Sequence, residues 1–127
     1  MSLRDQPHLP ALAPIDFYGN GGFRFGDMSH RGSLLCLPAG MWAWAVGSPA
    51  EIDEAALAPV LEAAKDFDIL IIGTGASPWL LPASLRTMLR DAGVSGLEVL
   101  QTGPAVRTYN ILLGERRRLA AALIAVD

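Results

Sequence analysis

Hydrophobic and polar positions alternate over short distances in the first third of the chain. In residues 15–38, Phe23 and Phe25 flank Arg24, and glycines interrupt the apolar pieces. This pattern is typical of β strands joined by tight turns. We therefore expect antiparallel β structure in this part of the chain.

An aromatic strip follows at residues 41–46, which read MWAWAV. In a strand, Trp42 and Trp44 would lie on the same face. Their indole rings would then pack in the core or at an interface, and a platform that stacks a ligand is the alternative. The strip predicts one more strand.

A helical pattern begins at Ser48. The spacing from Ser48 to Glu51 fits a capping box, and apolar residues then recur with a period near 3.6. The residues of this apolar face are Leu57, Val60, Leu61 and Ala64. Pro59 should kink the helix or restart it, because proline lacks a backbone donor and clashes with the preceding turn.

The second half of the chain alternates between strand and helix patterns. The expected elements are a buried strand over residues 68–73, a helix from Pro82 to Gly93, a strand over 96–101, a helix from Pro104 to Gly114, and a final strand within 117–127. Right-handed crossovers would make these strands parallel and cover the sheet with helices. We expect a single three-layer α/β domain over residues 14–127, with a mixed central sheet of parallel βαβ units, an added antiparallel β layer and a flexible leader over residues 1–13.

Composition narrows the class of function. A chain of 127 residues suits one domain, and its 51% hydrophobic content leaves ample material for a core. The positive mean hydropathy suggests apolar surface that another protein covers, and self-association into a homo-oligomer stays open. The net charge of −3 gives no support for nucleic-acid binding.

The chain shows no targeting or spanning pattern. Residues 1–14 contain three prolines and no apolar core of a secretory signal. The least charged stretch, residues 34–50, is broken by Pro38, Gly40 and Gly47 and falls short of the roughly 20 apolar residues of a spanning helix. We expect a cytoplasmic protein that does not insert directly into a membrane.

No catalytic or metal-binding constellation stands out. Cys36 is the single cysteine and reads as a buried core residue. His8 lies in a proline-rich leader and His30 in a turn-like stretch, so neither forms a metal or catalytic constellation with Cys36. The arginines at 116–118 follow a helix end, where cations complement the dipole. We predict no catalytic residue, no metal and no cofactor.

The sequence Gly73-Thr74-Gly75 marks the first candidate site. It follows a central strand, and open α/β sheets place ligand crevices at the carboxyl ends of their strands. The dinucleotide fingerprint would require a further glycine where Pro78 stands, and no phosphate-loop lysine follows. A tight turn and a small-molecule or anion site both remain open.

Arg107 marks the second candidate site. In the first turn of a helix, its charge would face the positive end of the helix dipole and would require an anionic partner. The structural partner would be Glu98 on the adjoining strand. The functional alternative is a ligand held between Arg107, Thr102 and Asn110 on one side and the glycine loop on the other.

These residues also carry a resemblance to a known family. Gly73-Thr74-Gly75, then Glu98, Thr102 and Ala105, and then the run Arg107-Thr108-Tyr109-Asn110 with Glu115 match its pattern. The chain resembles the small domain-of-unknown-function family that includes mitochondrial complex I assembly factor three, the adipogenesis-associated domain protein of animals and many uncharacterised bacterial proteins. The resemblance implies one three-layer α/β domain, no established catalytic activity and, for the mitochondrial member, a role in assembling a membrane-bound respiratory complex.

We therefore expect a non-enzymatic assembly or interaction factor with a protein partner, linked to the biogenesis of a respiratory or other membrane complex. The alternative is a small-molecule or anion-binding protein, or an enzyme, that uses the crevice. The candidate ligand-binding residues are Gly73, Thr74, Gly75, Glu98, Thr102, Arg107, Thr108 and Asn110.

Overall fold

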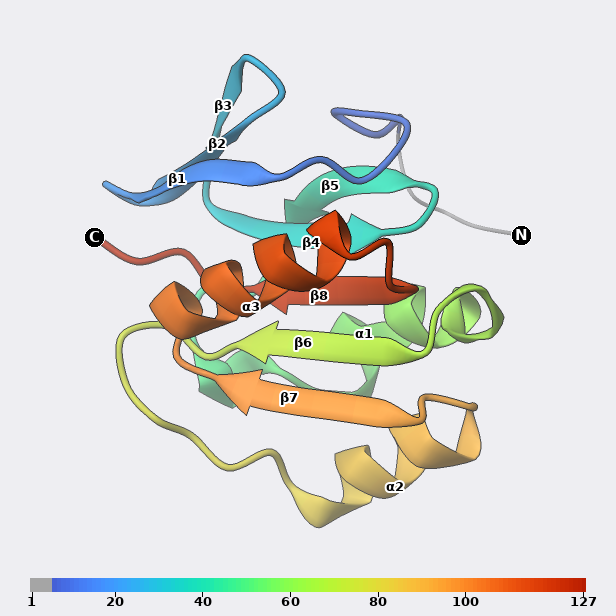
Figure 1. Ribbon diagram of the computed structural model, residues 1–127. Helices are drawn as coiled ribbons and strands as arrows, with labels where there is room; N and C mark the ends of the chain where they lie inside the picture. Colours follow the sequence, from blue (N-terminus) through green and yellow to red (C-terminus); the bar gives the residue numbers. More distant parts are fainter. Residues whose placement is uncertain (1–5) are drawn as a thin grey trace.

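The computed structural model describes residues 6–127, which form two β sheets and three α helices (Figure 1). The larger sheet has five strands in the order β5-β4-β8-β6-β7, and the smaller has three in the order β1-β2-β3. The strands are β1 (Ile15–Gly19), β2 (Gly22–Phe25), β3 (Met28–Arg31), β4 (Ser33–Leu37), β5 (Gly40–Trp44), β6 (Ile69–Gly73), β7 (Gly96–Leu100) and β8 (Leu119–Leu123). The helices are α1 (Glu54–Glu62), α2 (Ala83–Asp91) and α3 (Thr102–Gly114), with short 3₁₀ turns at Pro49–Glu51 and Ala64–Asp66.

The predicted parallel half is confirmed. β6 pairs in parallel with β7 on one side and with β8 on the other. All five residues of β8 are buried, which fits its place between β4 and β6 in the sheet. Ala121 of β8 packs in the same cluster as Ala105 of α3, whereas Ala120 and Ala122 pack in the cluster on the opposite face with α1 and α2.

The antiparallel first half is divided between the two sheets. β4 is antiparallel to both β5 and β8, so β4 and β5 extend the central sheet. β1, β2 and β3 form the separate antiparallel sheet, which lies on the side of α3 (Figure 1). Two hydrophobic clusters hold the layers: one joins the central sheet to α1 and α2, and the other joins it to α3 and the small sheet. The expected three-layer α/β fold with an added antiparallel layer is confirmed.

The tryptophan strip packs against α1. Trp44 is buried, and its indole N–H donates a hydrogen bond of 3.0 Å to the carbonyl oxygen of Ala56. Trp42 lies on the same face and packs against the same cluster. Core packing of the two rings, one of the two expectations, is thus observed.

The first helix begins later than predicted. The capping box at Ser48 and Glu51 is present, but it caps the 3₁₀ turn Pro49–Glu51 and not the α helix. The chain then turns, and Asp53 caps α1 by accepting a hydrogen bond of 2.8 Å from the N–H of Ala56. α1 also continues through Pro59 to its end, so the predicted restart at this proline is wrong.

Two other helix starts shift by one or two residues. Pro82 is the N-cap of α2 and not its first helical residue, and α3 begins at Thr102 instead of near Pro104. The predicted stops hold, since Gly93 follows α2 with a φ of +109° and α3 ends at Gly114. The earlier start of α3 moves Arg107 from the first helical turn to the second.

Residues 6–13 are attached to the domain, which differs from the loose leader expected over residues 1–13. The N–H of His8 donates to the carbonyl oxygen of Met41 at 2.8 Å, and the N–H of Met41 donates to that of Leu9 at 3.1 Å. Leu9 and Leu12 pack against the cluster beneath α3. These two leucines supply apolar contact that the proline-rich composition conceals; residues 1–5 lie outside the described part.

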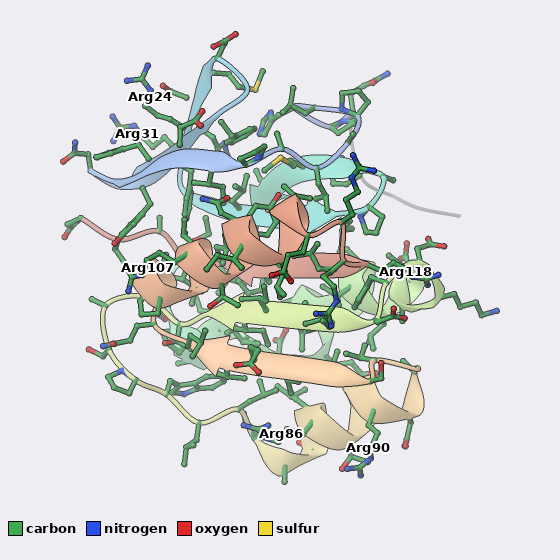
Figure 2. All side chains as sticks on the ribbon, in the orientation of Figure 1. Arg24, Arg31, Arg86, Arg90, Arg107 and Arg118 are labelled. Carbon is green, nitrogen blue, oxygen red and sulfur yellow. The ribbon has the colours of Figure 1, made fainter. Side chains whose placement is uncertain are left out.

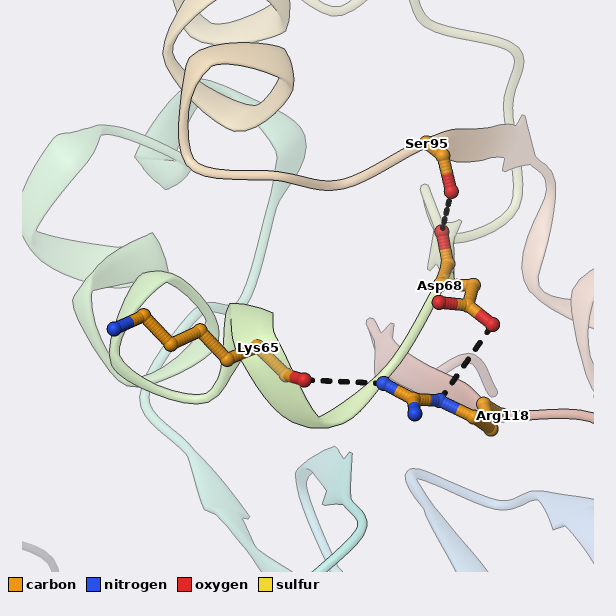
Figure 3. A network of polar contacts seen from close by, with 4 residues as sticks. All are labelled: Lys65, Asp68, Ser95 and Arg118. Carbon is orange, nitrogen blue, oxygen red and sulfur yellow. Dashed lines mark hydrogen bonds and ion pairs between the residues drawn. The ribbon is translucent and has the colours of Figure 1, made fainter.

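A polar network joins the amino ends of the three parallel strands β6, β7 and β8 (Figure 3). Arg118, just before β8, donates to the carbonyl oxygen of Lys65 at 3.0 Å and lies 3.5 Å from a carboxylate oxygen of Asp68. The carbonyl oxygen of Asp68 accepts the hydroxyl of Ser95, just before β7, at 3.2 Å. The side chains of Arg118 and Asp68 are more than half exposed, so this ion pair contributes little to stability. It lies at the end of the sheet opposite the Gly73-Thr74-Gly75 loop.

Candidate functional site

The loop after β6 packs tightly against the start of α3. A Cβ on Gly73 would lie 3.0 Å from the hydroxyl oxygen of Thr102 and 3.2 Å from its Cα, so no larger residue fits without movement. Gly75 has a φ of +93°, a conformation that side-chain-bearing residues rarely adopt. Both glycines therefore have conformational or packing roles in this loop.

Thr102 is the centre of the hydrogen bonds at this end of the sheet. Its side chain is fully buried; the hydroxyl accepts the N–H of Gly75 at 2.9 Å and donates to the carbonyl oxygen of Ile124 at 2.7 Å. Its own N–H donates to the carbonyl oxygen of Gly75 at 3.0 Å. The sequence correctly places Thr102 beside the glycine loop, but its hydroxyl and the Gly75 N–H are already bonded to each other within the protein.

Thr74 connects the loop to its neighbours. Its N–H donates to the carbonyl oxygen of Leu100 at 2.7 Å, and its hydroxyl donates to that of Ser77 at 2.8 Å. Gln101 adds a hydrogen bond from its side-chain amide to the carbonyl oxygen of Ala76 at 3.0 Å. The loop is therefore held to the end of β7 on one side and to the end of β8 on the other.

Thr74 also lines an apolar groove of about 450 Å³. We call it the Trp79–Leu80 groove; its lining residues are Thr74, Pro78, Trp79, Leu80, Val99, Leu100 and Gln101. Trp79 is half-buried, whereas Leu80 is 85% exposed. The sequence reasoning missed this surface, although the apolar run between Pro78 and Pro82 outside any strand or helix could have indicated it.

Arg107 and Glu98 do not form the predicted ion pair within residues 6–127. Both side chains are exposed, Arg107 on the second turn of α3 and Glu98 on the edge strand β7 (Figure 2 labels Arg107). An exposed guanidinium is solvated, and the dipole effect fades beyond the first turn of a helix. Arg107 thus requires no buried partner, because α3 begins earlier than expected.

Asn110 faces β1. Its side-chain amide N–H donates to the carbonyl oxygen of Ile15 at 2.9 Å, and its amide oxygen accepts the N–H of the same residue at 2.9 Å. The neighbouring Tyr109 donates its hydroxyl to the carbonyl oxygen of Ala13 at 2.8 Å. These two residues of the family-like motif attach the start of the small sheet to α3. Thr108, also in the motif, is half-buried on the same helix.

The buried Cys36 thiol and Tyr109 hydroxyl are neutral at ordinary pH. Burial raises the pKa of the Cys36 thiol far above its usual range, and burial likewise raises the pKa of Tyr109, with which Cys36 shares a hydrogen bond. Cys36 is fully buried, as expected. A protonated, enclosed thiol is a poor nucleophile.

The two histidines lie together, a contact that their separation in sequence conceals. The ring centroids of His8 and His30 are 4.8 Å apart, and a ring nitrogen of His30 lies 2.9 Å from the carbonyl oxygen of Ser33. Partial burial and the neighbouring His30 lower the pKa of His8. No group of three or more potential metal ligands forms within residues 6–127.

The structure also bears on the relation to membranes. Within the part of the chain that is described, no helix combines the length and the hydropathy needed to cross a lipid bilayer.

Comparison with known proteins places this arrangement in a wider group. The chain is 37% identical over 119 residues to an uncharacterised protein of Rhodobacter capsulatus, covering 94% of this chain and 90% of that one. It is 33% identical over 119 residues to the NADH dehydrogenase [ubiquinone] 1 alpha subcomplex assembly factor 3 of Danio rerio, covering 94% of this chain and 68% of the fish protein. The solution structure of the Rpa2829 protein from Rhodopseudomonas palustris superposes with a TM-score of 0.84 at 54% identity, covering 99% of this chain and 93% of that chain.

The family model for DUF498, described as "Protein of unknown function (DUF498/DUF598)", matches residues 15–124. This match spans both sheets and all three helices, so the resemblance inferred from the Gly73-Thr74-Gly75 loop and the Arg107-Thr108-Tyr109-Asn110 run is confirmed. The chain belongs to the DUF498/DUF598 family.

Proposed function

We propose that this chain is a non-enzymatic interaction factor that holds a partner protein during the assembly of a larger complex. The observation that carries the proposal is Leu80, which is 85% exposed at the rim of the apolar Trp79–Leu80 groove. An exposed leucine beside a half-buried tryptophan offers apolar area that binding of a partner would remove from water.

The relatives also support a role in the assembly of a complex. The fish relative is an assembly factor of an NADH dehydrogenase subcomplex, and its match extends over 94% of this chain. We propose on this basis that the complex assembled is a respiratory NADH dehydrogenase or another membrane complex, with this chain acting from the cytoplasm. No part of the proposal requires the chain itself to enter the bilayer.

The alternative of a small-molecule or anion site at the glycine loop has less support. The Gly75 N–H and the Thr102 hydroxyl would have to bind such a ligand, but the N–H donates to the hydroxyl oxygen, and the hydroxyl donates to the carbonyl oxygen of Ile124. Asn110 bonds to Ile15, and Arg107 lies on the exposed side of α3. A ligand at this position would have to displace internal hydrogen bonds, each worth about 0.5–1.5 kcal/mol.

Deletion of the gene in its own cell tests the proposal. We expect less fully assembled NADH dehydrogenase on native gels, restored by the wild-type chain but not by Leu80→Glu. Ile111→Glu is the matched control, since Ile111 is 61% exposed on α3 and does not line the groove. Restoration by Leu80→Glu to the level of Ile111→Glu would remove the groove from the account, and unchanged assembly in the deletion strain would overturn the proposed complex.

A further inference from the structure

The outer edge of β5 offers unpaired backbone groups. β5 stands at the end of the strand order, so within the sheet it pairs only with β4. Met41 directs its N–H and carbonyl oxygen outward, where they bond to Leu9 and His8. Because outward and inward backbone groups alternate along an antiparallel strand, those of Ala43 also point away from β4. Ala43 is exposed, and no residue in the range 6–127 is found to bond to its backbone.

A groove runs beside this edge, between β5 and the start of α1. Its volume is about 640 Å³, and its apolar lining includes Trp42, Ala43, Trp44, Ala55, Ala56 and Pro59. The small side chains of Ala43, Ala55 and Ala56 leave the groove open beside the tryptophan rings. Small apolar side chains of an added strand would fit this space, because alternate residues of a strand point to the same face.

The charged residues at the groove are acidic. Glu51 and Asp53 line it, and no lysine or arginine does so within the described residues. Each carboxylate accepts a backbone N–H at a helix start, Glu51 from Ser48 and Asp53 from Ala56. The two acidic side chains therefore give this groove a rim that would attract a cationic partner.

We propose that the β5 edge binds an extended segment of a partner protein as an added strand. The segment continues the pairing that Leu9 begins at Met41, places apolar residues in the groove at alternate positions, and carries a lysine or arginine that meets Glu51 or Asp53. A second copy of this chain is disfavoured as the occupant, because edge-to-edge pairing would bring the two sets of carboxylates together. The β5 edge and the Trp79–Leu80 groove lie at opposite edges of the sheet, so this inference does not depend on the proposed function.

Selection from a library of random twelve-residue peptides, displayed on phage and bound to the full chain, tests the inference. We expect enriched peptides with alternating apolar residues and at least one basic residue. Ala43→Pro, which removes the outward N–H from an edge position that tolerates proline, should weaken the enriched peptides at least tenfold. Ala55→Arg, an exposed helix substitution that fills the groove with positive charge, should do the same.

Thermal unfolding identifies variants that fail to fold, and Leu80→Glu serves as a folded control that should keep wild-type peptide affinity. The inference is overturned if no peptide is enriched, if the enriched peptides are acidic, or if they bind Ala55→Arg as tightly as wild type. It is also overturned if sedimentation shows a dimer that Ala43→Pro dissociates, because the edge would then hold a second copy.

Discussion

At the scale of single residues, Thr102 shows how one hydroxyl group joins three segments. It links the loop after β6 at Gly75, the start of α3 and the residue after β8, Ile124. Because the site is fully buried, water cannot replace the hydroxyl as a partner. Thr102 therefore has a structural role that its position in a family-like motif does not by itself disclose.

Thr102→Val should lower the free energy of unfolding by about 2–4 kcal/mol, since a buried donor and a buried acceptor each lose a partner. Urea denaturation measures the change. Thr102→Ser, which keeps the hydroxyl, is the control and should lose less. A valine variant within about 0.5 kcal/mol of wild type would contradict this role.

Arg107→Ala should leave the free energy of unfolding within about 0.5 kcal/mol of wild type, because the side chain is exposed and forms no ion pair with Glu98. Urea denaturation again measures the change. A loss above about 1.5 kcal/mol would show that Arg107 has a structural partner after all.

The contact between His8 and His30 predicts a pH dependence. The pKa of His8 is lowered from its ordinary value of 6.5, so the unfolded chain binds the proton more readily than the folded one. The free energy of unfolding should therefore reach its full value above about pH 6.5 and fall as the pH drops through the lowered pKa that His8 has in the folded chain. His8→Gln should show a shallower slope of unfolding free energy between pH 7 and pH 5; an identical slope would contradict the assignment.

At the scale of elements, α3 attaches the small sheet to the central one. Tyr109 and Asn110 bond to the backbone of Ala13 and Ile15, at the point where the chain enters β1. Ile15 is buried, so its N–H and carbonyl oxygen would be unsatisfied without Asn110. The packing of the small sheet, β1 to β3, against the rest of the domain should therefore depend on the side-chain amide of Asn110.

Asn110→Ala should lower the free energy of unfolding by about 2–4 kcal/mol, because two buried backbone groups lose their partner. Hydrogen exchange should also quicken first in β1, β2 and β3, while β6 and β8 stay protected. Uniform loss of protection across both sheets would indicate that Asn110 supports the whole domain equally.

Local patterns predicted most elements but not their tertiary contacts. The alternation in residues 15–38 and the apolar run at 68–73 identified strands. A strand buried on one face shows alternating apolar residues, and a strand buried on both faces shows a continuous apolar run. The start of α3 was missed, since Thr102 is fixed by a hydrogen bond to Gly75, 27 residues earlier. The partner of Asn110 is 95 residues away, and no periodicity reports such a contact.

At the scale of the whole molecule, the two edges of the central sheet have different surroundings. The β7 edge carries the Trp79–Leu80 groove near the carboxyl ends of the strands. The β5 edge carries a groove that has apolar lining residues and acidic residues at its rim. The glycine loop between them is closed by its own hydrogen bonds. An interaction factor fits this arrangement because its exposed apolar surface lies in grooves of the outer strands.

The most direct test of the proposed function is native mass spectrometry of the chain gently purified from its own cell. We expect a specific partner chain bound to the wild type and to Ile111→Glu, with binding to Leu80→Glu weakened at least tenfold, because a charge would replace a leucine that the partner covers. A stoichiometric small molecule that is lost from Arg107→Ala, with no partner chain on any variant, would contradict it and restore the crevice as the site of function.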